Sequence, residues 1–164
     1  RITLRTRMVF IGNPNNPTGS CVPPHEITAF VTALPEGVIV LLDKAYREYV
    51  PDALQPDTVR YAKEGRPVIA LRSFSKIYGL SGLRIGYAIA PPDCIKLIDK
   101  ARQPFNVNAL ASAAALAAVG DAAHLISSRR LNEAICTRRS RSLDCATCRQ
   151  RRTSSSSIWG RGAI

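Results

Sequence analysis

A single lysine in a turn rich in small and hydroxyl residues is the most chemically suggestive feature of the sequence. Lys76 is flanked by Ser73 and Ser75, and Arg84 follows eight residues later. A neutral lysine amine attacks carbonyl groups, which requires a pKa lowered by burial or by nearby cations. A guanidinium can bind a phosphate through two hydrogen bonds, and the serine hydroxyls can donate to the same group. The combination indicates an aldehyde cofactor that carries a phosphate, and pyridoxal phosphate has both groups.

Three further polar residues follow apolar segments and fit the same chemistry. Asp43 directly follows the apolar run Val38–Leu42 and could pair with a protonated pyridine nitrogen, which keeps the ring a strong electron sink. Tyr46 and Asn16 could both reach the phenolic oxygen of the cofactor. Each residue also has an ordinary structural interpretation. Lys76 could be a solvated surface lysine and Arg84 half of an ion pair. Asp43 could be a helix cap, Tyr46 core packing, and the serines and Asn16 turn residues.

The elements that position these residues alternate between strands and helices. We predict strands at 8–11, 38–42, 68–71 and 84–90, and helices at about 24–34, 94–101, 109–119 and 122–134, with a short helix within 51–66. Asp93 is expected to cap the helix that begins near Cys94. This alternation is typical of an α/β fold with a largely parallel sheet flanked by helices. Because ligands gather at the carboxyl ends of such strands, Asn16, Asp43 and the Ser73–Lys76 turn should lie at one edge.

Composition separates residues 1–134 from a basic tail at 135–164. The tail carries seven arginines and one aspartate, a net +6 of the total +11, and shows neither helical nor strand periodicity, so we expect it to be disordered. Cys136, Cys145 and Cys148 have the spacing of half a zinc site without a second pair, so no metal is predicted. No apolar run approaches a membrane span and no secretory signal precedes the first strand, so the expected location is cytoplasmic.

Four stretches together resemble the pyridoxal-phosphate aminotransferases of the aspartate-aminotransferase fold type. The sequence contains Asn-Pro-Asn-Asn-Pro-Thr-Gly at 13–19, Asp-Lys-Ala-Tyr-Arg-Glu-Tyr at 43–49, the lysine turn at 73–87, and Gln-Pro-Phe-Asn-Val-Asn at 103–108. Their order and spacing match the family, and the fourth stretch is typical of its histidinol-phosphate branch. Two positions depart from the family pattern: Lys44 replaces the usual glutamate beside Asp43, and Ser81 replaces a smaller residue.

The resemblance implies a role for each candidate residue. Lys76 would be the catalytic lysine that forms the Schiff base, and Asp43 would pair with the pyridine nitrogen. Asn16 and Tyr46 would contact the phenolic oxygen. The phosphate would be held by Ser73, Ser75 and Arg84. The implied fold is part of the large domain of fold type I, and the implied partners are an amino donor and a 2-oxo acid, with a homodimeric assembly.

The implied reaction is transamination between histidinol phosphate and 2-oxoglutarate in histidine biosynthesis. A threonine-phosphate decarboxylase or another amino-acid aminotransferase is the alternative within the class. A nucleic-acid-binding protein acting through the arginine-rich tail is the alternative from another class, weakened by the tail's lack of interleaved aromatic residues. The resemblance covers residues 1–134 of a family of roughly 350 residues, so we expect little activity from this chain alone. The abrupt change near residue 135 suggests a shift of reading frame.

Overall fold

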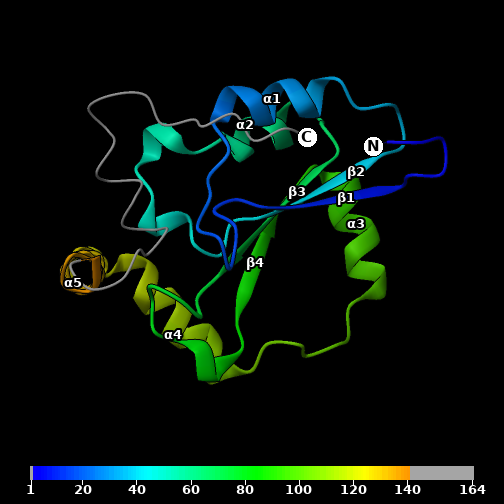
Figure 1. Cartoon of the computed structure of the whole chain (residues 1–164). Helices are drawn as coiled ribbons and strands as arrows, with labels where there is room; N and C mark the ends of the chain where they lie inside the picture. The colour runs from blue at the N-terminus through cyan, green and yellow to red at the C-terminus, as the bar shows by residue number, and fades with distance from the viewer. Residues whose placement is uncertain (1, 141–164) are drawn as a thin grey trace.

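Four strands form one sheet, in the order β1-β2-β3-β4, in the computed structural model (Figure 1). The strands are β1 (Met8–Gly12), β2 (Ile39–Asp43), β3 (Val68–Ser73) and β4 (Gly86–Ile89). The first three run parallel, and β4 pairs antiparallel with β3. The structure describes residues 2–140, with side chains through residue 133. Residues 141–164, which include Cys145, Cys148 and most of the basic tail, lie outside that part, so the expectations for them stay predictions.

Helices connect and cover the strands. The α-helices are α1 (Pro24–Thr32), α2 (Thr58–Lys63), α3 (Pro92–Ala101), α4 (Ala109–Gly120) and α5 (Ala122–Ser140), and the short 3-10 helices are η1 (Arg47–Tyr49), η2 (Asp52–Leu54) and η3 (Ser81–Leu83). The expected α/β class and mostly parallel sheet are therefore confirmed. The backbone of α5 continues six residues past the end expected at residue 134. The boundary between residues 134 and 135 stays a prediction.

The hydrophobic core lies on one face of the sheet, beneath α1 and α2, which Figure 1 shows side by side. Its buried members come from both helices and from β2 and β3: Ile27, Val31, Val40, Leu42, Tyr61 and Val68. Side chains alternate between the two faces of a strand, and every second residue of β2 is buried while its neighbours are half-buried. The apolar run at 38–42 is thus fully covered on one face only. The other face remains available to Asp43.

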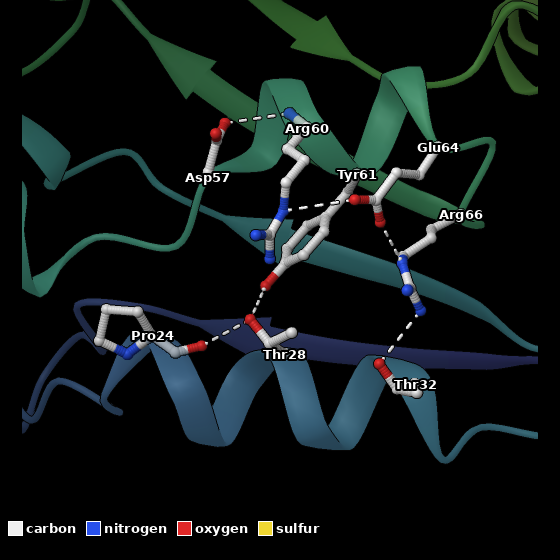
Figure 2. Close-up of polar contacts among 8 residues, drawn as sticks. All are labelled: Pro24, Thr28, Thr32, Asp57, Arg60, Tyr61, Glu64 and Arg66. Carbon is white, nitrogen blue, oxygen red and sulfur yellow. Dashed lines mark hydrogen bonds and ion pairs between the residues drawn. The ribbon is translucent and has the colours of Figure 1, made fainter.

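Polar contacts fasten α1 to α2 above this core (Figure 2). The Tyr61 hydroxyl lies 2.6 Å from Thr28 Oγ1, which itself donates to the Pro24 carbonyl at 2.8 Å. Because the single hydrogen of the Thr28 hydroxyl is used for Pro24, Tyr61 must donate to Thr28. Arg66 binds both Glu64 Oε2 at 2.6 Å and Thr32 Oγ1 at 3.1 Å. These bonds hold the two helices in register over the sheet.

Two expected helix and strand ends differ in the structure. Pro91 rather than Asp93 precedes the first residue of α3, and Asp93 lies in the first turn, where its carboxylate accepts a hydrogen bond from Lys96. The expected cap is therefore wrong, because proline at the helix start already fixes the required backbone angle. The strand expected from Arg84 begins at Gly86, because Arg84 has a left-handed backbone with φ of 52°.

None of the helices in residues 2–140 is by itself long and apolar enough to cross a membrane. The pair α4 and α5 passes that test jointly, by length and composition alone, and the two helices meet at an angle of 80°.

We expect Gly86→Ala to destabilise the fold, because β4 passes very close to β3 at this position. A Cβ atom on residue 86 would lie 2.6 Å from the carbonyl oxygen of Arg72, whereas one on Gly82 would meet nothing within 4 Å. Forcing the two strands apart should cost about 1–3 kcal/mol of unfolding free energy. Urea denaturation checks this, with Gly82→Ala as the matched control. Equal midpoints for the two variants would contradict the close approach.

Candidate functional site

The carboxyl ends of β1, β2 and β3 meet at one edge of the sheet, and an open pocket of about 290 Å³ lies there. Its lining comes from β1 and the turn after it, from the end of β2, and from the turn after β3: Phe10, Gly12, Pro14, Asn15, Asn16, Asp43, Ala45, Tyr46 and Lys76. Four candidates from different parts of the sequence are therefore brought together. A hollow of about 330 Å³ at the opposite, amino-terminal ends of β1 and β2 contains none of them.

The turn after β1 is held from within by a buried asparagine. Asn13 is fully buried, and its side chain both accepts from the Val22 amide at 2.8 Å and donates to the Val22 carbonyl at 3.2 Å. The Asn13-Pro14 and Asn16-Pro17 peptide bonds are both cis. This turn carries Asn16 to the pocket. Sequence reasoning treated Asn13 only as part of a turn cluster, although a paired asparagine directly after an apolar strand is a usable signal for such a clamp.

Asp43 ends β2 on the face away from the core. Its Oδ1 accepts a hydrogen bond from the Ala45 amide at 2.9 Å, while its backbone carbonyl accepts from Asn13 at 2.9 Å. The carboxylate is half-buried, and Asp43 is one of the residues that line the pocket. Tyr46 follows in the next turn, and Asn16 Nδ2 lies 3.4 Å from its hydroxyl. An amide and a phenol therefore converge beside the carboxylate.

Lys76 approaches this group from the turn after β3. Its Nζ lies 5.2 Å from the centre of the Tyr46 ring, an arrangement that favours a cation over the ring face. The side chain is exposed in this structure, so burial, one of the two conditions named for a neutral amine, is not found. The turn around it is ordered by bonds from Gly79 N to Lys76 O at 2.9 Å and from Leu80 N to Phe74 O at 3.0 Å.

The hydroxyl and guanidinium candidates form a second group next to Lys76, outside the lining of the pocket. Ser73 Oγ accepts from the Ser75 amide at 3.0 Å. Arg84 Nη1 donates to Ser75 Oγ at 3.4 Å and to the Ser81 carbonyl at 3.0 Å. The left-handed backbone at Arg84 returns its side chain towards Ser75. A guanidinium and two hydroxyls within one turn form a donor set suited to a phosphate.

The buried position of Lys44 was not predicted from the sequence. It is buried at 1% exposure, and its Nζ donates to the Pro56 carbonyl at 3.1 Å. The pKa of Lys44 is lowered to about 8, mainly by burial and then by Arg47 and Arg72, while Glu48 and Asp57 act in the opposite direction. Lys44, one residue beyond the end of β2, is thus buried against Pro56, whereas Asp43 lines the pocket.

A buried ion pair supports the loop that carries Tyr46. Arg72 Nη2 lies 2.5 Å from Glu48 Oε1, with side-chain exposures of 11% and 8%. The Arg72 guanidinium also lies 5.7 Å from the centre of the Tyr87 ring. Since Arg72 belongs to β3 and Glu48 to η1, this pair ties the segment after Asp43 to the strand that leads to Lys76. Sequence reasoning did not single out either residue.

Comparison with known proteins shows the family to which the chain is similar. The model of the family described as aminotransferase class I and II matches residues 2–144. Histidinol-phosphate aminotransferase 1 of Cupriavidus pinatubonensis is 51% identical over 133 residues, which cover 81% of this chain and 35% of that protein. An aromatic amino acid aminotransferase of Mycolicibacterium smegmatis is 46% identical over 125 residues, covering 76% and 35%. The chain thus spans about a third of the length of these relatives.

Solved structures that resemble this fold include a histidinol-phosphate aminotransferase. The crystal structure of histidinol-phosphate aminotransferase from Sinorhizobium meliloti in complex with pyridoxal-5'-phosphate superimposes with a TM-score of 0.71 and 38% identity, covering 75% of this chain and 33% of that one. Most of the fold therefore has a counterpart of known structure.

Proposed function

Because the chain belongs to the class I and II aminotransferase family, we propose that it carries the cofactor-binding part of a pyridoxal-phosphate-dependent transaminase. We further propose histidinol phosphate and 2-oxoglutarate as its substrates. The observation that carries the proposal is the convergence of an amine, a carboxylate, a phenol and an amide on one pocket, from Lys76, Asp43, Tyr46 and Asn16. The named relatives support the choice of substrate class.

The donor set fits each polar group of pyridoxal phosphate. Lys76 would bond covalently to its aldehyde carbon. Asp43 would pair with the pyridine nitrogen through the carboxylate oxygen not used by Ala45. Asn16 and Tyr46 would donate to the phenolic oxygen, since they already lie within 3.4 Å of each other.

The remaining candidates complete this set on the phosphate side. Ser73, Ser75 and Arg84 would hold the phosphate, which carries the opposite charge to the guanidinium.

Each residue would then contribute a definite part of the chemistry. The bound cofactor supplies an electron sink for the bonds of the substrate's α-carbon. Asp43 would keep the ring nitrogen protonated, because a carboxylate favours a nearby positive charge. Once the substrate's amino group has taken its place on the aldehyde carbon, the free Nζ of Lys76 would take a proton from the substrate's α-carbon and hold it for return. The Tyr46 ring lies near Lys76 Nζ and would limit the positions open to that amine.

Other substrates within the class are the second candidate. The aromatic amino acid aminotransferase of Mycolicibacterium smegmatis is 46% identical, which lies within the range of 45% to 51% found for histidinol-phosphate relatives. Assembly as a homodimer and a cytoplasmic location are proposed on the family resemblance. Nucleic-acid binding by the arginine-rich tail remains a prediction about residues that lie mostly outside the described part.

We expect Lys76→Ala to abolish covalent binding of pyridoxal phosphate. The full chain mixed with pyridoxal phosphate should develop a visible absorption band, and reduction with borohydride followed by peptide mass spectrometry should place the adduct on Lys76. Lys100→Ala, which removes an exposed lysine of α3, is the matched control and should keep the band. An undiminished band in Lys76→Ala, or an adduct on another lysine, would refute the assignment. Loss of the band on adding histidinol phosphate, and not on adding tyrosine, would favour the first substrate.

A further inference from the structure

His124 makes a contact across the fold that its position on an exposed helix would not suggest. Its Nε2 lies 3.0 Å from the carbonyl oxygen of Ile77, the residue that directly follows Lys76, although the two are 47 positions apart. Ile77 itself is buried at 3% exposure. A histidine of an exposed helix therefore contacts the backbone of the lysine turn.

The direction of this hydrogen bond follows from its partners. A carbonyl oxygen can only accept, so Nε2 must carry a hydrogen and donate to Ile77. Ser128 Oγ, one helical turn further along α5, lies 3.2 Å from the same nitrogen. The carbonyl of Ile77 therefore fixes which ring nitrogen is protonated, and Ser128 can share that hydrogen as a second acceptor.

The backbone of His124 is fixed at the start of α5 by a hydrogen bond. Asp121 precedes α5, and its Oδ1 accepts the backbone N–H of His124 at 2.8 Å, which caps the first turn of the helix. The same helix packs against η1, the segment directly after Tyr46. α5 thus touches both the turn of Lys76 and the loop beside Tyr46.

We propose that His124 is a positioning residue for Lys76, acting through the Ile77 carbonyl to fix the lysine turn relative to α5 and the Tyr46 loop. This rests on the proposed role of Lys76 in binding pyridoxal phosphate. His124 is not assigned any contact with cofactor or substrate. Its effect is to hold the backbone one residue beyond the lysine, so that Nζ stays over the Tyr46 ring.

Three variants separate this role from simple packing. His124→Phe keeps a ring without a donor, and His124→Gln restores an N–H donor at a similar distance from the backbone. Ser128→Ala removes the second neighbour of Nε2 and leaves the bond to Ile77 intact, so it is the matched control. A positioning role requires the glutamine variant to recover what the phenylalanine variant loses.

The first measurement needs no cofactor. Hydrogen exchange of the Gly79 and Leu80 amides, which bond within the lysine turn, should be about 3–10-fold faster in His124→Phe, the change expected from losing one hydrogen bond. Exchange in His124→Gln and Ser128→Ala should match the wild-type chain. Unchanged exchange in His124→Phe, or equal acceleration in the phenylalanine and glutamine variants, would overturn the proposal.

The second measurement uses the full chain with pyridoxal phosphate. The rate of appearance of the Lys76-dependent absorption band should fall about 3–10-fold in His124→Phe and return in His124→Gln. An unchanged rate would overturn the proposal even if exchange responds. Absence of any Lys76-dependent band in the wild-type chain would instead contradict the proposed function, and the exchange result would then still decide whether His124 holds the turn.

Discussion

Glu48→Ala is expected to destabilise the chain by about 3–5 kcal/mol, because it leaves the guanidinium of Arg72 buried without its partner. The two side chains are 8% and 11% exposed, and they join η1 to β3. The loss of Glu48 also removes a carboxylate that favours the charged form of nearby Lys44. An effect of this size is comparable with the whole unfolding free energy of many small domains.

The measurement is urea denaturation of the variant beside two controls. Asp52→Ala breaks the Arg47–Asp52 pair, whose side chains are 31% and 84% exposed, and should cost less than about 1 kcal/mol. A double variant with Glu48→Leu and Arg72→Met removes both charges together and should recover most of the loss. A double variant as unstable as Glu48→Ala would show that packing, and not the unpaired charge, causes the effect.

Lys44→Met is expected to stabilise the chain near pH 7 and to lose that advantage as the pH rises. The pKa of Lys44 is about 8 in the folded chain, against an ordinary value of 10.5, mainly because of burial. Below pH 8 the amine is charged in both states, so the full penalty of burying the charge applies. Between pH 8 and 10.5 the folded state releases its proton first, so the stability of the wild-type chain rises with pH.

The pKa difference corresponds to about 3 kcal/mol, and loss of the hydrogen bond to Pro56 offsets about 1 kcal/mol of it. The methionine variant should therefore be about 2 kcal/mol more stable at pH 7 and slightly less stable than wild type above pH 10.5. Denaturation midpoints across this range test the sign. Lys96→Met, which removes a lysine exposed at 73%, should show no such crossover. Parallel curves for Lys44→Met and wild type would contradict the depressed pKa.

Much of the sheet could be predicted because local patterns decide it. Apolar runs marked all four strands, and the turn after each of the first three carried a polar residue. The parallel order then required Asn16, Asp43 and Lys76 to converge, as the pocket shows. The antiparallel direction of β4 could not be predicted, because it depends on the left-handed backbone at Arg84 and the short turn around η3.

The parts that sequence reasoning missed depend on contacts between distant residues. Neither Glu48 nor Arg72 has a local signal, and the pair exists only because η1 folds back against β3. His124 lies on a helix with no distinctive pattern, and its contact with Ile77 depends on how α5 crosses the lysine turn. The exposure of Lys76 was also beyond local reasoning, because it depends on what surrounds the turn in space.

Asp43 and Lys44 are adjacent in the sequence but lie in different surroundings. Asp43 lines the pocket, so we expect a change there to alter what the proposed site binds. Lys44 is buried, where its amine bonds to the Pro56 carbonyl and is repelled by Arg47 and Arg72. Its charge therefore affects the stability of the fold. We therefore expect exchange of Lys44 to change how stability depends on pH, and to leave the ligand preference of the proposed site unchanged.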